Sequence, residues 1–275
     1  MTGRITSPVE MDGPAVFDKT NSPVADLPPI DALESLALEA ESEISRELVG
    51  FATNDIRSRP FSLLRGQFMK EASRAGRRLI GVTSAAPGAG KTFVTSNLAA
   101  SISKIPGQQV YLFDLDLRRP ALADRFGIEI ECGLETFFDG KTNDLGSIGR
   151  KIEGTGLGVF ATNRIDPYPG DMLGGERLDA FIAALHRLPS NCVVLCDLPP
   201  AFVSDDALSV IGRLDAYIHV LDEGVTPKRQ AEELRNMMQP APCLGVVLNR
   251  YDGQWNDSYG YASSRQYDRY HDAED

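Results

Sequence analysis

The chain has 275 residues, of which 42% are hydrophobic and 24% are charged, and this composition is typical of a globular protein. Its net charge of −11 argues against general binding to nucleic acid or to anionic lipid. Residues 1–55 hold 11 acidic and 3 basic side chains, so most of the negative charge belongs to an N-terminal extension.

This extension, residues 1–56, is expected to be largely disordered. Residues 1–29 are rich in Pro, Asp, Ser and Thr and contain few large apolar side chains. Apolar residues recur at helical spacing over residues 31–49, which predicts a helix capped by Asp31. A second helix is expected from Pro60, with an apolar face formed by Phe61, Leu64 and Phe68. The two helices either pack against the core or dock onto a partner.

Short apolar runs alternate with helical patterns after residue 76. We expect strands at residues 79–83, 110–114, 156–162, 192–197, 216–221 and 244–249. Helical patterns occupy residues 91–103, 174–188, 204–213 and 227–238. Apolar strands separated by helices predict an α/β fold, with a mostly parallel sheet and helices on both faces. One domain, residues 57–251, contains all of these elements, and residues 252–275 form a polar, flexible tail.

The most informative motif is Ala-Ala-Pro-Gly-Ala-Gly-Lys-Thr at residues 85–92, between a predicted strand and a predicted helix. It matches the P-loop, or Walker A, pattern except that Ala85 replaces the first glycine. Glycines there let backbone N–H groups face phosphate oxygens at a helix N-terminus. Lys91 would reach the β- and γ-phosphates of ATP, and the Thr92 hydroxyl would bind Mg²⁺. The expected ATP-binding residues are Pro87, Gly88, Ala89, Gly90, Lys91, Thr92 and Phe93.

Acidic residues at two strand ends complete a predicted phosphoryl-transfer site. Asp197 follows an apolar strand, where a Walker B carboxylate helps to hold Mg²⁺. Asp114 and Asp116 end another strand, and acids one residue apart can serve the metal and an incoming hydroxyl respectively. The predicted metal residues are Thr92, Asp114 and Asp197. The predicted catalytic residues are Lys91, Asp114, Asp116 and Arg118.

The combination resembles the cytoplasmic domain of the bacterial tyrosine autokinases (BY-kinases) of capsule and exopolysaccharide biosynthesis. The matching motifs are Pro-Gly-Ala-Gly-Lys-Thr at 87–92, Asp-Leu-Asp-Leu-Arg-Arg-Pro at 114–120, Asp-Leu-Pro-Pro at 197–200, and the segments 167–173 and 245–249. The resemblance implies a P-loop NTPase fold and ATP-dependent tyrosine autophosphorylation that controls polysaccharide polymerisation and export. It places Asn249 near the adenine. It also implies self-association and an activating membrane-spanning polysaccharide co-polymerase on a separate chain.

The sequence departs from this family in a few places, and alternatives stay open. The family's ring-assembly motif Glu-x-x-Arg-x-x-Arg falls on Arg59, Ser62 and Arg65, of which only Arg65 matches. Partition and division-site ATPases are related, but they carry a signature lysine at the position of Ala86. A non-catalytic, ATP-binding regulator of polysaccharide export is the other alternative.

Five of the eight tyrosines lie near the C-terminus, at Tyr251, Tyr259, Tyr261, Tyr267 and Tyr270. The segment around them has too few apolar residues to fold by itself. It resembles the C-terminal tyrosine cluster of the BY-kinases, which implies autophosphorylation. Tyr251 adjoins the last strand, so Tyr259, Tyr261, Tyr267 and Tyr270 are the expected acceptors. The alternative is a partner-binding tail that carries no modification.

Cysteine content and hydropathy indicate where the protein works. The four cysteines are too scattered for a disulfide scaffold, and Cys192 and Cys196 are expected to be buried thiols. No apolar run reaches the roughly 20 residues that span a bilayer, and residues 1–10 lack a signal-peptide core. We therefore expect a cytoplasmic protein that its partner recruits to the inner face of the membrane.

Overall fold

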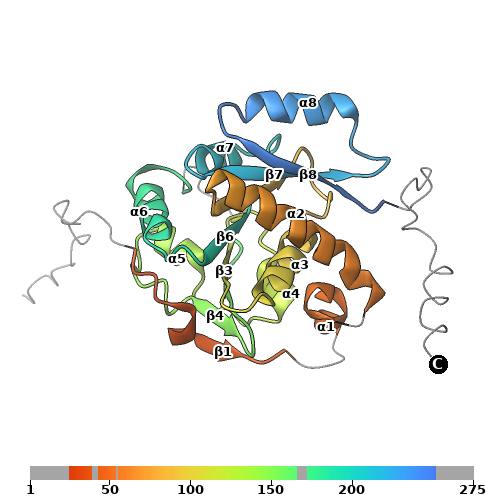
Figure 1. Ribbon diagram of the computed structural model, residues 1–275. Helices are drawn as coiled ribbons and strands as arrows, with labels where there is room; N and C mark the ends of the chain where they lie inside the picture. Colours follow the sequence, from red (N-terminus) through yellow and green to blue (C-terminus); the bar gives the residue numbers. More distant parts are fainter. Residues whose placement is uncertain (1–24, 39–42, 54, 166–171, 252–275) are drawn as a thin grey trace, which may run out of the picture.

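A computed structural model describes residues 25–38, 43–53, 55–165 and 172–251 (Figure 1). Within these residues, eight strands form one sheet in the order β1-β4-β5-β3-β6-β2-β7-β8. The strands are β1 (Glu34–Leu36), β2 (Leu79–Ser84), β3 (Gln109–Asp114), β4 (Gly149–Ile152), β5 (Leu157–Phe160), β6 (Cys192–Asp197), β7 (Ala216–Asp222) and β8 (Cys243–Asn249). All neighbouring pairs are parallel except the antiparallel pair β4–β5. The predicted mostly parallel α/β sheet is confirmed.

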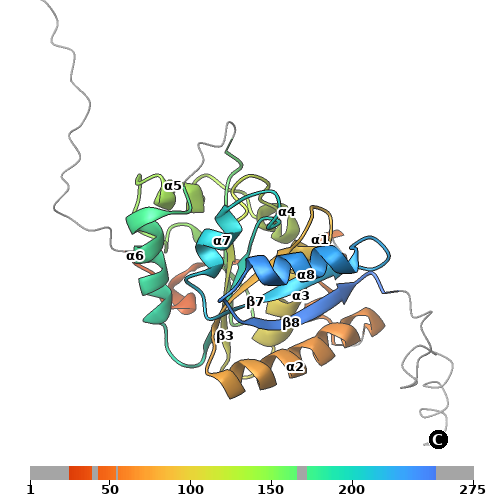
Figure 2. The same cartoon turned by 90° about the horizontal axis from the view of Figure 1, so that it is seen from above.

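Helices cover both faces of this sheet (Figures 1 and 2). They are α1 (Glu43–Glu47), α2 (Arg59–Ala75), α3 (Lys91–Ser103), α4 (Leu122–Phe126), α5 (Leu134–Phe138), α6 (Gly175–His186), α7 (Asp206–Ile211) and α8 (Lys228–Met237). Three 3₁₀ turns add η1 (Ile30–Ala32), η2 (Val49–Phe51) and η3 (Ile56–Ser58). Helices α2, α3 and α4 pack on one face, and α5, α6, α7 and α8 pack on the other.

The central strands are apolar throughout because both of their faces are buried. In β3, Tyr111 and Phe113 point into the core beneath α5 and α6, whereas Val110 and Leu112 point into the core beneath α3. Every residue of β2 and β6 is buried as well. This explains why continuous apolar runs, rather than alternating ones, marked these strands in the sequence. All six predicted strands are present, and α3 covers the predicted residues 91–103.

The prediction of one helix over residues 31–49 was wrong. The region contains η1, strand β1, the short helix α1 and η2 instead. Its apolar residues go to different places, since Leu33 packs into the core on one face of the sheet and Leu48 into the core on the other. Strand β1 pairs with β4, from Glu34 opposite Arg150 to Leu36 opposite Ile152. Pairing with the sheet edge therefore overrides the local helical pattern.

The expectation that residues up to 56 form a largely disordered extension needs correction for the described part. Ala25 and Ile30 are each only 1% exposed, so the core begins well before residue 57. The Tyr111 hydroxyl donates a hydrogen bond to the Pro28 carbonyl, and the Leu145 N–H donates one to the backbone carbonyl of Asp26. The extension from residue 25 onward is thus part of the folded unit. Residues 1–24 and 252–275 lie outside the described residues.

Leu33→Ala tests whether the N-terminal strand region belongs to the core. The Leu33 side chain is 5% exposed and lies over Gly149 and Gly158, where added Cβ atoms would come within about 3 Å of it. The substitution should lower the free energy of unfolding by about 2–5 kcal/mol, measured by urea denaturation. The control Leu63→Ala, at a side chain 53% exposed on α2, should change it by under about 0.5 kcal/mol. Equal unfolding midpoints for the two variants would contradict this assignment.

Candidate functional site

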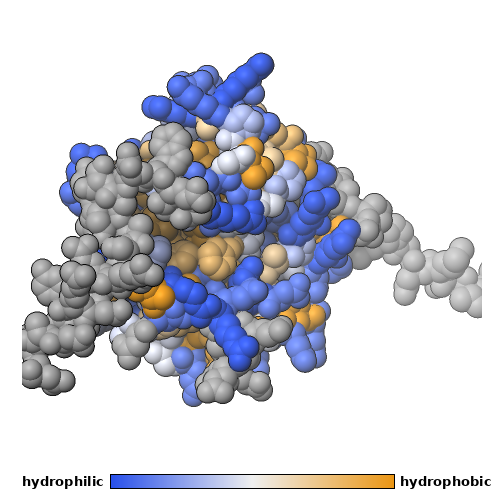
Figure 3. Space-filling view, turned by 90° about the vertical axis from the view of Figure 1, so that its right-hand side faces the viewer, coloured by the Kyte–Doolittle hydropathy of each residue, from blue (hydrophilic) through white to orange (hydrophobic). Residues whose placement is uncertain are grey.

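A pocket of about 1440 Å³ opens at the carboxyl ends of the parallel strands. Figure 3 shows this side of the molecule, where hydrophobic side chains lie in a hollow that hydrophilic side chains surround. Ligands of open α/β sheets bind in this crevice. Among the described residues, eight cationic side chains line the pocket, against the acidic Glu47 and Asp116: Arg46, Arg57, Lys91, Arg118, Arg119, Arg125, Arg164 and Arg250. This lining suits an anionic ligand.

The loop between β2 and α3 forms the centre of the pocket. Gly88 and Gly90 have φ of 84° and 83°, in the left-handed region that glycine adopts without strain. Gly90 precedes the first residue of α3, so the backbone N–H groups of the helix start at this loop. A Cβ at Gly90 would also lie 2.1 Å from Nδ2 of Asn249. The loop therefore has the backbone shape that a phosphate-binding loop requires.

Asn249, at the end of β8, holds this loop. Its Nδ2 donates a hydrogen bond of 2.9 Å to the Ala89 carbonyl, 160 residues away in sequence. The side chain lines the pocket as well, together with Pro87 and Phe93. A place beside the adenine remains a prediction for Asn249, but the observed contact already gives it a role in fixing the loop.

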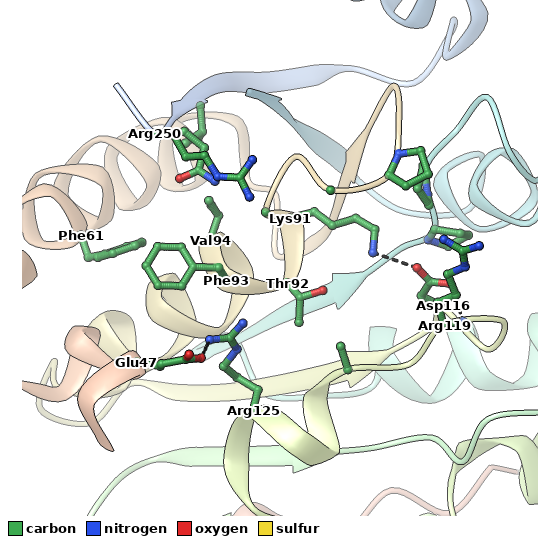
Figure 4. Close-up of a pocket in the computed structure, with 18 of the residues that line it drawn as sticks. Glu47, Phe61, Lys91, Thr92, Phe93, Val94, Asp116, Arg119, Arg125 and Arg250 are labelled. Carbon is green, nitrogen blue, oxygen red and sulfur yellow. Dashed lines mark hydrogen bonds and ion pairs between the residues drawn. The ribbon is translucent and has the colours of Figure 1, made fainter. Parts of the chain in front are cut away.

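Lys91, the first residue of α3, points to the end of β3 (Figure 4). Its Nζ lies 2.8 Å from Oδ2 of Asp116, and both side chains are largely buried, 12% and 4% exposed. Burial lowers the pKa of Lys91, but Asp197 and Asp116 outweigh burial and raise it. Lys91 is therefore a cation in the folded protein.

Three predicted carboxyl groups gather at the base of the pocket, where Asp116 lines it and Asp114 and Asp197 lie beneath. Asp114 and Asp197 are fully buried, and Asp116 is 3% exposed. Asp197 accepts hydrogen bonds from the hydroxyls of Thr92, at 2.5 Å, and Thr95, at 3.4 Å. Burial, and next the proximity of Asp197, raise the pKa of Asp114 to about 8. The crowding of buried carboxyl groups thus keeps Asp114 largely protonated near neutral pH.

Asp114 and Arg118 organise the loop that follows β3. Asp114 Oδ2 accepts hydrogen bonds of 2.9 Å from the N–H groups of Ala121 and Leu122. Arg118 lines the pocket and places Nε 3.3 Å from Oδ2 of Asp206, the first residue of α7. Asp114 therefore supports the loop on which Asp116 and Arg118 are carried.

The donor set fits Mg²⁺, which takes hard oxygen ligands. Thr92 and Asp197 supply a hydroxyl and a carboxylate in direct contact, and Asp114 and Asp116 place two more carboxyl groups nearby, whose mutual repulsion a divalent cation would offset. Within the described residues, no group of three or more His, Cys, Asp or Glu is placed to hold a metal alone. Mg²⁺ sites use few protein ligands and complete the shell with water and substrate phosphates.

One wall of the pocket was not predicted from the sequence. The N-terminal region contributes four residues to this wall, Arg46, Glu47, Val49 and Arg57, and the start of α2 contributes Phe61. Other cations, Arg125, Arg164 and Arg250, come from three separate loops or elements. A sequence signal exists only for Arg250, which follows Asn249 directly. The remaining residues converge through the tertiary fold.

Comparison with known proteins agrees with this geometry. Residues 80–267 match the CobQ/CobB/MinD/ParA nucleotide binding domain. The chain belongs to this family. The tyrosine-protein kinase YwqD of Bacillus subtilis (strain 168) is 28% identical over 188 residues, which are 67% of this chain and 77% of YwqD. The tyrosine-protein kinase Etk of Escherichia coli (strain K12) is 31% identical over 183 residues, 66% of this chain but 24% of Etk. The chain therefore spans about a quarter of the length of the longer relatives.

A solved kinase domain shares the fold of this family member. The BceF tyrosine kinase domain is 25% identical to it with a TM-score of 0.63, and the match covers 73% of this chain and 80% of that domain. The resemblance to bacterial tyrosine kinases that the motifs indicated is confirmed by these relatives. The predicted roles of individual site residues remain predictions.

Lys91→Met tests nucleotide binding by this member of the family. Loss of the ammonium should raise the Kd of a non-hydrolysable ATP analogue about 10- to 100-fold, because hydrogen bonds to charged groups contribute about 1.5–3 kcal/mol. Isothermal titration calorimetry measures the Kd, and circular dichroism verifies the fold. The control Lys104→Met changes a lysine of the same region whose Nζ bonds the Ala52 carbonyl instead. Equal affinity in wild type and folded Lys91→Met would refute the assignment.

Proposed function

We propose that the protein is an ATP-dependent protein-tyrosine autokinase that regulates exopolysaccharide or capsule polymerisation and export. The observation that carries the proposal is the contact between Lys91 Nζ and Asp116 Oδ2. A P-loop lysine binds the β- and γ-phosphates, so a carboxylate in contact with it lies where the γ-phosphate meets an acceptor. A protein that only binds nucleotide does not need a carboxylate there. The kinase names of the relatives support this choice.

Phosphoryl transfer needs positioning and charge neutralisation more than covalent chemistry. Lys91 would bind the phosphates, while Thr92 and Asp197, with the predicted support of Asp114, would hold Mg²⁺. The bound Mg²⁺ would neutralise charge on the phosphates. Asp116 would orient the tyrosine hydroxyl and take its proton as the tyrosine oxygen bonds the γ-phosphorus and the bond to ADP breaks. Arg118, which Asp206 holds at the pocket edge, would assist with the phosphate charge.

The alternatives are weaker but testable. The family includes MinD and ParA, yet the signature lysine of partition ATPases is replaced by Ala86, which is consistent with the kinase names. A non-catalytic regulator would bind ATP without transfer. Incubation with labelled ATP, with and without the activator, distinguishes the kinase from the regulator. Incorporation of label into tyrosine supports the kinase, and ATP binding without incorporation supports the regulator.

A membrane-spanning polysaccharide co-polymerase on another chain is the proposed partner, at the inner face of the membrane. In the part of the chain that the structure describes, no helix has the length and apolar character to cross a bilayer. Self-association is proposed too. The one matching residue of the ring-assembly motif, Arg65, donates to the Ser101 carbonyl at 2.9 Å, so its side chain already binds within the chain.

Asp116→Asn tests the proposed division of roles. The amide cannot accept the proton or pair ionically with Lys91, so phosphoryl transfer should slow at least about tenfold. ATP affinity should stay equal or increase, because Lys91 is released for the phosphates. Single-turnover transfer and calorimetric Kd are the two readouts. The control is Asp124→Asn, at an exposed aspartate of α4. Transfer at the wild-type rate in Asp116→Asn would contradict the role of Asp116.

Mass spectrometry after co-expression with the activator tests the predicted acceptors. Tyr259, Tyr261, Tyr267 and Tyr270 lie outside the described residues, and the proposal for them rests on sequence. Phosphotyrosine should occur at these positions and be absent from Lys91→Met. Each phosphate adds about −1.5 to −2 charges, so phosphorylation should weaken self-association through repulsion. Abundant phosphotyrosine elsewhere, with none after residue 249, would refute the assignment.

A further inference from the structure

Part of the N-terminal extension forms a wall of the nucleotide pocket. We call residues 46–53 the docking segment. Arg46, Glu47 and Val49 of this segment line the same pocket as Lys91 and Thr92. None of the motifs that identify the site lies in this region. The docking segment therefore lines the pocket without being part of the P-loop motif.

One buried side chain attaches the docking segment to α3. Asn97 is fully buried, and its Oδ1 accepts a hydrogen bond of 2.8 Å from Gly50 N–H. Its Nδ2 donates to the carbonyl of Glu47 at 3.1 Å and to that of Phe93 at 3.0 Å. The fit is close, because a Cβ at Gly50 would lie 2.2 Å from the Asn97 carbonyl oxygen. The side chain that anchors the segment thus also binds the first turn of α3, next to Thr92.

A second connection is made at the pocket surface. Glu47 forms an ion pair with Arg125, and the Arg125 guanidinium lies 5.7 Å from the centre of the Phe93 ring. Figure 4 shows Glu47, Arg125 and Phe93 on the side of Thr92 away from Asp116. The docking segment therefore sets the position of a cation and of an aromatic residue at one end of the pocket.

That end suits the nucleoside rather than the terminal phosphate. Lys91 and Asp116 mark the γ-phosphate position, so the ribose and base of a bound nucleotide extend away from Asp116. We infer that the docking segment positions the nucleoside end of ATP, through Asn97 and the Glu47–Arg125 pair, so that this chain's own extension completes the nucleotide site. This inference rests on the proposed binding of ATP but not on phosphoryl transfer.

The ratio of two affinities tests the inference. ATP and inorganic tripolyphosphate both use the P-loop, but only ATP has a nucleoside. Calorimetry of the full chain should show that Gly50→Ala lowers the affinity for ATP, relative to the affinity for tripolyphosphate, about tenfold. This change corresponds to a loss of about 1.4 kcal/mol of binding free energy from the misplaced nucleoside contacts. The matched control Gly66→Ala, on α2 with no atom within 4 Å of the added Cβ, should leave the ratio unchanged.

Glu47→Gln provides a second variant, in case Gly50→Ala fails to fold. The Glu47 side chain is 61% exposed, so its substitution keeps the backbone contacts to Asn97 and removes only the pairing with Arg125. Loss of the Glu47 negative charge should strengthen the binding of both anionic ligands. Loss of its pairing with Arg125 should instead lower the ratio of the ATP affinity to the tripolyphosphate affinity, by about threefold. An unchanged ratio in Glu47→Gln and in folded Gly50→Ala overturns the inference. Failure of the wild type to bind either ligand would instead refute nucleotide binding itself.

Discussion

The constraint on which the site depends is the burial of two carboxylates side by side. In the sheet register, Asp114 of β3 lies opposite Asp197 of β6, and both are fully buried. Such a pair is costly unless neighbouring groups offset the charge. Here the Thr92 hydroxyl and Lys91 stabilise Asp197, while backbone N–H groups of the loop after β3 bind Asp114. The P-loop helix and that loop are therefore held in place by hydrogen bonds to the two carboxyl groups that they stabilise.

Two asparagines from opposite directions fix the P-loop and its helix. Asn249, from the last strand, binds the carbonyl of Ala89 in the loop. Asn97, within α3, binds the backbone of Glu47 and Gly50 in the N-terminal region. The last strand and the region around residues 47–50 thus both contact the P-loop and its helix, although only Asn249 belongs to a recognisable motif. A phosphate site needs backbone N–H groups at fixed positions, and these amide side chains supply that rigidity at the loop and along the helix.

Local sequence signals predicted the centre of the sheet and the P-loop, because these elements depend on short-range patterns. The strands β2, β3 and β6 are apolar on both faces, and α3 starts where Gly90 ends the loop. The sheet edge formed by β1 and β4 could not be predicted in the same way. Strand β4 carries Arg150 and Lys151, which form ion pairs with Glu34 and Asp31 of the N-terminal region, and it pairs with β1 of that region, so its partners on this side are distant in sequence. The pocket wall formed by residues 46–57 was missed for the same reason, since only tertiary contacts bring it to α3.

The charges in the pocket connect the binding of a phosphate at Lys91 with the state of the Asp116 carboxylate. The chain carries a net charge of −11, yet the pocket lining is mostly cationic, because Asp114 and Asp197 lie beneath it rather than on its surface. Lys91 contacts Asp116 in this structure, and an entering phosphate competes for the same ammonium. A phosphate bound by Lys91 would weaken its contact with Asp116, whose carboxylate would then be available to an incoming hydroxyl. In the proposed kinase, binding of the nucleotide would thus itself prepare the base, and the base would stay paired with Lys91 while no nucleotide is bound.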